Sequence, residues 1–327
     1  MTPRATLADL ATVLLDDATS PTLLADTLDR YRDLLLTASG LDMSAPDSLQ
    51  PHDTGRGVAI GATWAALCLD DQLRTWCFIR GLAAAVAERR ANGPVHVLYA
   101  GTGPFATLAL PLVTRYRPDE LQFTFLEINA VSLAAVRHTL RALGLEDYVR
   151  DVVQTDASTY QVPDPEGVDI LLTETMQYGL VDEMQVPIAL NLLNQLPGDA
   201  LMVPERIELS LVLLRDDRKL APVTGELGSL ITVDRQNLRA YLRTEASTDF
   251  PTVRIALPES GGWLAMRTAI TTYGPHRLAD YDSGLTFPDL IGQFPDELGV
   301  PDYVDCTYQM DPSPFMRMAF AAPALAV

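Results

Sequence analysis

The feature that most constrains the fold is an alternation of short apolar runs with helical patterns between residues 95 and 203. Each run is shorter than an ordinary helix and is typical of a buried strand. The runs are residues 95–100, 123–126, 149–153, 168–172 and 200–203. Helical patterns occupy residues 105–115, 130–143 and 181–196. Strands that alternate with helices form a parallel sheet with helices on its faces, so the sequence predicts a doubly wound α/β fold.

The residues on either side of this region follow other patterns. Apolar residues recur at helical spacing in residues 5–38 and 62–92, and the polar stretch 39–56 between them is interpreted as a linker or a lid. From Ile207 onward, polar and apolar residues alternate, apart from one amphipathic stretch at 234–243. We therefore predict a helical N-terminal cover (1–92), a Rossmann-like domain (93–205) and a β-rich C-terminal domain (206–327).

Composition excludes several classes of function. The formal net charge of −19 opposes binding to nucleic acid. Lys219 is the only lysine and lies in a charged run, so neither a Schiff-base lysine nor a P-loop is expected. The cysteines form no C-x-x-C pair and the histidines are scattered, so no metal site is expected. The apolar stretches are too short to span a bilayer and no signal-peptide pattern is present, so we expect a cytoplasmic protein without a membrane partner.

A glycine-rich turn follows the first predicted strand. The segment is Tyr99-Ala100-Gly101-Thr102-Gly103. Glycines at such a turn let the backbone approach a ligand closely, and the N-terminus of a following helix favours negative charge. Gly101, Gly103 and Ala106 also satisfy the dinucleotide-binding spacing. On this turn alone, an enzyme that uses NAD competes with one that uses S-adenosylmethionine (SAM).

Residues after the next three strands separate these two cofactors. Glu127 ends the second strand, where a carboxylate accepts hydrogen bonds from both ribose hydroxyls of either cofactor. Asp156 follows the third strand, where SAM enzymes commonly hold the adenine amino group. Glu174 and Tyr178 belong to an acidic and aromatic loop after the fourth strand, at the edge where ligands bind. A NAD domain has no particular use for such a loop, so the set predicts SAM.

Three further features resemble one enzyme family. They are the segment Asp71-Gln72-Leu73-Arg74-Thr75, the nine-residue spacing of Glu174 and Glu183, and Pro204 before the β-rich part. Over roughly residues 60–210, the chain resembles the protein arginine methyltransferases. The resemblance implies a class I methyltransferase fold, a SAM cofactor whose carboxylate pairs with Arg74, and two glutamates that grip the acceptor. The cofactor-binding residues would be Arg74, Tyr99, Ala100, Gly101, Thr102, Gly103, Glu127, Ile128, Asp156 and Ala157.

Two departures from that family bear on the acceptor. The family carries Trp-Met-Gly between its two glutamates, whereas this chain has Thr175-Met176-Gln177. The nearest counterpart of the family's Thr-His-Trp motif is Thr271-Thr272-Tyr273, which lacks both His and Trp. The resemblance therefore extends better to the cofactor than to an arginine side chain, and a small-molecule acceptor fits better. Relatives of this architecture often dimerise, which adds a homodimer to the expectations.

The leading hypothesis is a SAM-dependent methyltransferase that acts on a small, natural-product-like acceptor. Glu174, Tyr178 and Glu183 are the candidate catalytic residues, and Glu174 would orient or deprotonate a nitrogen acceptor. A second hypothesis is a lyase that cyclises SAM to azetidine-2-carboxylate and methylthioadenosine, with the Tyr178 ring against the sulfonium. A third is a SAM-binding regulatory protein without catalysis.

Overall fold

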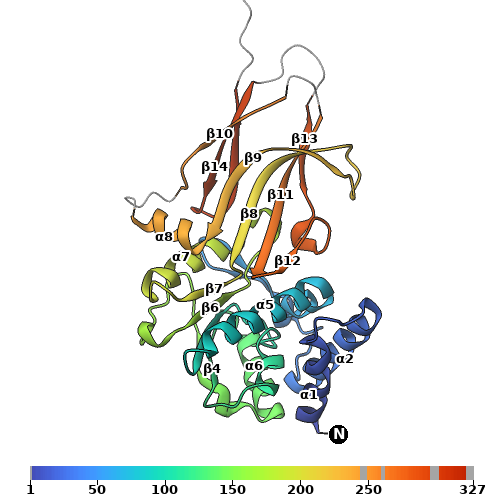
Figure 1. The fold of residues 1–327 in the computed structure, drawn as a ribbon, viewed down its shortest axis with the longest axis vertical. Helices are drawn as coiled ribbons and strands as arrows, with labels where there is room; N and C mark the ends of the chain where they lie inside the picture. The colour runs from blue at the N-terminus through green and yellow to red at the C-terminus, as the bar shows by residue number, and fades with distance from the viewer. Residues whose placement is uncertain (1, 244–248, 259–261, 295–301, 322–327) are drawn as a thin grey trace, which may run out of the picture.

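The computed structural model describes residues 2–243, 249–258, 262–294 and 302–321. Helices surround a parallel sheet in the N-terminal two thirds of the chain, and long antiparallel strands of the C-terminal third extend away from them (Figure 1). Within the described residues, no helix is long and apolar enough to cross a membrane.

The five strands of the parallel sheet have the order β5-β4-β3-β6-β7. They are β3 (Val95–Ala100), β4 (Leu121–Glu127), β5 (Val149–Gln154), β6 (Ile170–Thr173) and β7 (Leu201–Val203). Every neighbouring pair is parallel, and all six residues of β3 are buried. The predicted doubly wound sheet is confirmed. The strand order reverses between β3 and β6, and ligands bind outside the carboxyl ends of the strands at such a reversal.

Three long helices pack around this sheet. They are α5 (Gln72–Arg90), α6 (Ala130–Leu143) and α7 (Gln185–Gln195). The side chain of Asn129 caps α6 by accepting hydrogen bonds from two backbone N–H groups, and Gly144 ends the helix with a φ of 63°. Short 3₁₀ helices lie in the connections, at η3 (Glu146–Tyr148), η4 (Pro165–Gly167) and η5 (Tyr178–Leu180).

The helix predicted at residues 105–115 is wrong. A series of turns leads instead into a short 3₁₀ helix, η2 (Leu110–Thr114). Ala106 has a φ of 51°, which a right-handed helix does not allow. Pro111 has no N–H to donate, and the N–H groups of Ala109 and Leu112 bond to carbonyls three residues earlier. The apolar spacing is real, but it belongs to buried turns.

The N-terminal cover is helical, as predicted. Its elements are α1 (Pro3–Leu14), α2 (Pro21–Ser39), α3 (Pro46–Leu49), β1 (His52–Asp53), β2 (Val58–Ala59), α4 (Ala62–Leu67) and η1 (Cys68–Asp70). Thr2 and Ser20 cap α1 and α2, each with proline at the first helical position. The stretch predicted as a linker or a lid contains α3 and β1, and β1 pairs with β2 just beyond it as a small antiparallel hairpin.

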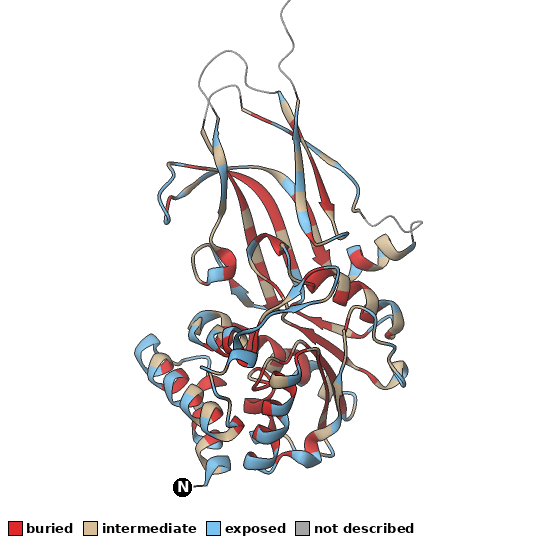
Figure 2. Cartoon of the chain, turned by 180° about the vertical axis from the view of Figure 1, so that it is seen from behind, coloured by how far each residue is buried: buried red, intermediate tan, exposed pale blue. Residues whose placement is uncertain are grey.

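The C-terminal third consists mainly of antiparallel strands, as predicted. Its elements are β8 (Arg206–Leu214), β9 (Val223–Asp234), α8 (Arg235–Arg243), β10 (Val253–Ala256), β11 (Gly262–Tyr273), β12 (His276–Leu278), η6 (Gly284–Thr286), β13 (Asp289–Phe294), β14 (Tyr303–Gln309) and β15 (Phe315–Phe320). One sheet has the order β12-β11-β8-β9, with β13 also paired to β11, and a second has the order β10-β14-β15. Buried residues continue from the parallel sheet into β8 and β11 (Figure 2).

Contacts of strand β11 fasten the β-rich part to helix α5. Thr272 on β11 is fully buried and donates a hydrogen bond to the carbonyl of Cys77, 2.9 Å away. A Cβ atom on Gly81 would lie 2.4 Å from the Thr272 hydroxyl, so glycine is needed where β11 crosses the helix. Thr272, the centre of the predicted Thr271–Tyr273 counterpart, therefore packs between domains.

Candidate active site

A cavity of about 300 Å³ lies at the carboxyl edge of the parallel sheet. Its volume is at the lower end of the range for small-molecule sites. The predicted site residues on its wall are Arg74, Tyr99, Gly101, Thr102, Gly103, Glu127, Ile128, Asp156, Ala157, Glu174, Tyr178 and Glu183. Ala100 is completely buried inside β3 and does not line the cavity. The structure thus brings together residues from four strand ends and from helix α5.

The glycine turn after β3 is pressed against the loop that follows β6. Gly101 has a φ of 75° and Gly103 a φ of 58°, both in the left-handed region. A Cβ atom on Gly101 would lie only 2.1 Å from the Thr175 methyl carbon. Glycine is therefore required at Gly101 both by the backbone and by this contact.

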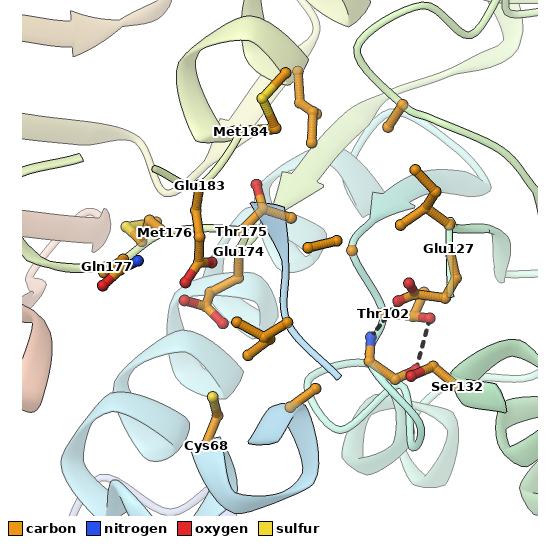
Figure 3. Close-up of a pocket in the computed structure, with 18 of the residues that line it drawn as sticks. Cys68, Thr102, Glu127, Ser132, Glu174, Thr175, Met176, Gln177, Glu183 and Met184 are labelled. Atoms are coloured by element: carbon orange, nitrogen blue, oxygen red, sulfur yellow. Dashed lines mark hydrogen bonds between the residues drawn. The ribbon is translucent and has the colours of Figure 1, made fainter. Parts of the chain in front are cut away.

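Glu127 presents a buried carboxylate to the cavity. The side chain is only 7% exposed, and the backbone N–H groups of Gly103 and Asn129 each donate to a different oxygen at 2.9 Å. Burial raises the pKa of Glu127, and these backbone bonds partly oppose that rise. The carboxylate lines the cavity, where it can also accept hydrogen bonds from a ligand. Figure 3 shows this carboxylate beside Thr102 at one end of the cavity.

The segment after β5 carries the second predicted cofactor carboxylate. Asp156 accepts a hydrogen bond from the backbone N–H of Ser158 through Oδ1, at 2.8 Å. The carbonyl of Ala157 accepts one from the Asn191 side chain on α7, at 2.9 Å. These bonds fix the segment at the cavity wall, on the same side of the sheet edge as Glu127.

Arg74 and Glu174 form an ion pair inside the cavity wall. Their Nη2 and Oε1 atoms lie 2.5 Å apart, and each side chain is 13% exposed. Arg74 belongs to the first turn of α5, where its backbone N–H donates to the capping carboxylate of Asp71. Glu174 directly follows β6. Arg74, which was predicted to bind the cofactor carboxylate, therefore already contacts Glu174, one of the two glutamates predicted to grip the acceptor.

Glu183 lies opposite Glu174. Helix α7 begins at Gln185, so Glu183 lies in the preceding loop and not within the helix predicted from residue 181. Figure 3 shows the two carboxylates close together and pointing into the same space. Burial, followed by the charge of Glu174, raises the pKa of Glu183 to about 7, although Arg74 opposes the shift. Near neutral pH this group exists in both protonation states.

Hydrogen bonds from the β-rich part hold the loop that carries Tyr178 and Glu183. Leu180 and Asp182 both have positive φ angles, at 55° and 60°. The hydroxyl of Tyr308 donates to the Leu180 carbonyl at 2.6 Å, and the Asp182 N–H donates to the Pro314 carbonyl at 2.8 Å. Such strained backbone persists only where the surroundings fix it. Tyr178 is 39% exposed at the cavity mouth.

Several wall residues were not predicted from the sequence. Those next to Glu174 and Glu183 in the sequence are Thr175, Met176, Gln177 and Met184. Those from the N-terminal cover are Thr54, Val58, Ala59, Ile60 and Cys68. The Val58 N–H donates to the Asp182 carbonyl at 3.0 Å, so the β1–β2 hairpin lies against the turn before Glu183. The polar stretch interpreted as a linker or a lid contained the start of this hairpin, but no motif in it indicated the contact.

The β-rich part also reaches the cavity through η6. Gly284 and Leu285 line the wall, although the sequence around them indicated only a turn. The Ser283 hydroxyl and the Gly284 N–H both donate to Oδ2 of Asp71, at 2.6 and 2.9 Å. Asp71 and Ser283 are 212 residues apart, so no local pattern could reveal this contact.

Comparisons with known proteins were made by sequence and by structure. No family model matches the sequence, and a comparison with curated proteins finds no match. Many solved structures are similar, including the following two. A Trypanosoma brucei PRMT1 enzyme–prozyme heterotetrameric complex with AdoHcy matches with a TM-score of 0.51 and 15% identity, over 77% of this chain and 95% of that one. A crystal structure of PRMT6 matches with a TM-score of 0.53 and 14% identity, over 78% and 97%. The chain therefore has the class I SAM-dependent methyltransferase fold, in the form found in these two structures, at a sequence identity of 14–15%.

Proposed function

We propose that this protein is a SAM-dependent methyltransferase whose acceptor is a small molecule with a proton-bearing nucleophile. The cavity residues fit the cofactor. Glu127 presents a buried carboxylate that can accept from ribose hydroxyls, and Gly101 and Gly103 bring the backbone to the cavity wall. Arg74 offers a guanidinium for the amino-acid carboxylate, and Asp156 a carboxylate for the adenine amino group. When bound, SAM supplies an activated methyl group on a sulfonium.

The observation that carries the proposal is the pair of facing carboxylates at the other end of the cavity. Glu183 has a pKa of about 7 and can take a proton from an acceptor near neutral pH. Glu174 is held by Arg74 and is suited to orient the acceptor. The division of roles differs from the sequence-based hypothesis, in which Glu174 was the first choice for both.

The enclosure of the acceptor end supports a small acceptor. The β1–β2 hairpin covers the cavity through Val58 and Ile60, and Leu285 adds apolar surface from the β-rich part. The natural-product class of the acceptor, the cytoplasmic location and the homodimer stay predictions from the sequence.

The test is chromatography of incubations of the purified protein with SAM, with and without a panel of small amines, guanidines and phenols. We expect S-adenosylhomocysteine only when an acceptor is present. Methylthioadenosine released from SAM alone would replace the proposal with the SAM-cyclising lyase, for which Tyr178 would offer its ring. Tight binding of SAM without either product would favour the regulatory protein.

Glu183→Gln separates a catalytic role from a binding role. The variant keeps the size of the side chain but cannot take a proton, so kcat should fall while SAM affinity is retained. Glu146→Gln, at an exposed position on η3 away from the cavity, is the matched control and should retain full activity. Full activity in Glu183→Gln would remove this residue from the mechanism.

A further inference from the structure

The side chain of Gln185 is buried behind the cavity wall, and its hydrogen bonds join two loops. Gln185 is the first residue of α7 and is only 1% exposed. Its Oε1 atom accepts hydrogen bonds from the backbone N–H of Thr175 at 3.0 Å and from the Thr175 hydroxyl at 3.1 Å. Longer contacts of 3.4 Å join its carboxamide to the hydroxyl and the carbonyl of Thr173, the last residue of β6.

These bonds connect the bases of the two segments that carry the facing carboxylates. Thr175 directly follows Glu174, and Gln185 lies two residues after Glu183. Thr175 is also confined on its other side, because its methyl carbon packs against Gly101. The loop that carries Glu174 is therefore held between the start of α7 and the glycine turn.

A role in binding does not explain why Gln185 is buried. The side chain is not part of the cavity wall, so it would not touch a ligand there. A buried carboxamide costs free energy unless its donor and acceptor are bonded, and here both are bonded to the β6 end and its loop. The arrangement is that of a side chain that supports its neighbours.

We propose that Gln185 is a positioning residue that fixes the separation of the Glu174 and Glu183 carboxylates, so that both act on one acceptor atom. The catalytic consequence rests on the proposed methyl transfer. The effect of Gln185 on the separation of the two carboxylates is independent of methyl transfer, because it needs no bound ligand.

The titration of Glu183 reports this separation. The charged groups around Glu183 are Glu174 from the loop after β6, Arg74 from α5 and the adjacent Asp182, and the thiol of Cys68 lies in the same wall. Glu174 is the second largest cause of the raised pKa, after burial. A loop that loses its bonds to Gln185 lets Glu174 move away, so the pKa of Glu183 falls.

The experiment compares two methionine variants of the same helix. Gln185→Met keeps the length of the side chain and removes its hydrogen bonds. Gln195→Met is the matched control, because Gln195 accepts from Val162 N–H and donates to the Tyr160 carbonyl, both at 2.8 Å, far along α7 from the carboxylates. Carbon-13 NMR of glutamate-labelled protein follows the titration of Glu183, assigned by its loss in Glu183→Gln, and kcat and KM are measured alongside.

In Gln185→Met, we expect the pKa of Glu183 to fall from about 7 toward its ordinary value of 4.5. We also expect kcat to fall roughly 10- to 100-fold, as small misplacements of catalytic groups do, with KM for SAM nearly unchanged. Gln195→Met should change neither the titration nor kcat. An unchanged Glu183 titration in Gln185→Met would overturn the proposal.

The two proposals fail in different ways. If the native protein forms no methylated product, the proposed function fails, while the NMR titration still decides whether Gln185 sets the separation. If Gln185→Met does not fold, Thr175→Val removes only the hydroxyl bonds and keeps the backbone bond to Gln185. A smaller fall in the pKa of Glu183 is then expected, and no fall at all would count against the proposal.

Discussion

Nη2 of Arg74 lies 2.5 Å from Oε1 of Glu174, which joins helix α5 to the loop after β6 across 100 residues of sequence. The guanidinium has five donors in a fixed fork, so it can bind Glu174 and a ligand carboxylate together. In the proposed complex, one side chain would thus contact the cofactor and a residue that orients the acceptor.

Removing one partner of this pair should destabilise the protein. Arg74→Met leaves the Glu174 charge without its partner in a site that is mostly shielded from water, at an expected cost of about 2–4 kcal/mol. Arg74→Met combined with Glu174→Met should recover part of that loss, because no lone charge remains. Urea denaturation of both single variants and the double variant measures the coupling free energy. Strictly additive losses would show that the ion pair contributes nothing to stability.

Loss of the Glu127 carboxylate should weaken SAM binding. Glu127→Ala removes the proposed acceptor of both ribose hydroxyls, and the expected loss is roughly 2–4 kcal/mol of binding free energy. Asp156→Ala should cost less, because only the adenine amino contact is lost. Calorimetric titration with S-adenosylhomocysteine measures both. Asp147→Ala, at an exposed position on η3, is the control. Native affinity in Glu127→Ala would place the ribose elsewhere.

A single methyl group at Gly101 should displace the loop after β6 and so distort the site. In Gly101→Ala the new Cβ would meet the Thr175 methyl at 2.1 Å, and the φ of 75° adds strain. Gly144→Ala is the matched control, because its φ of 63° gives similar strain but nothing lies within 4 Å. Both variants should lose about 1–2 kcal/mol of stability from the backbone. Only Gly101→Ala should lose the rise in melting temperature on addition of SAM, measured by a thermal shift assay.

The raised pKa of Glu183 predicts how stability depends on pH. Because the folded-state pKa of about 7 exceeds the ordinary 4.5, the native protein holds a proton that the unfolded chain has lost between these values. Stability from this group therefore declines as pH rises from 4.5 to 7 and stays low above it. Glu183→Gln removes the decline, so at pH 8 the variant should be more stable than native by up to about 3 kcal/mol.

The native protein and Glu183→Gln should be equally stable near pH 4.5, where Glu183 is protonated in the folded state. Chemical denaturation at several pH values checks both points. The control Glu146→Gln should change the free energy of unfolding by the same small amount at every pH. A stability difference that is the same at pH 5 and pH 8 would mean that Glu183 titrates normally.

The cofactor end of the site could be predicted because its residues follow strand ends. Glu127 and Asp156 come directly after apolar runs, and parallel strands bring their carboxyl ends to one edge. The family resemblance added Arg74, which precedes the first strand of the sheet. The helix after the glycine turn was mispredicted because apolar spacing alone does not register Pro111 or the positive φ of Ala106.

The acceptor end was harder to predict because it depends on contacts between distant segments. Gln185 lies in an apolar helical pattern, where nothing marks its carboxamide as buried. The positive φ angles of Leu180 and Asp182 depend on bonds to Tyr308 and Pro314, more than 100 residues away. The sequence pattern there indicated a helix from residue 181, whereas these bonds hold an irregular loop and delay the helix to Gln185.

The contact of Asp71 with Ser283 and Gly284 has a consequence for protein engineering. One carboxylate caps α5 near Arg74 and, through its other oxygen, holds the η6 loop whose Leu285 lines the cavity. A foreign loop grafted after Gly284 would be seated by the same anchor, because Oδ2 of Asp71 binds a hydroxyl and a backbone N–H that precede the graft. Under the proposed function, residues 285–288 are therefore the segment through which to redesign the range of accepted molecules, with Glu127 and Asp156 left unchanged.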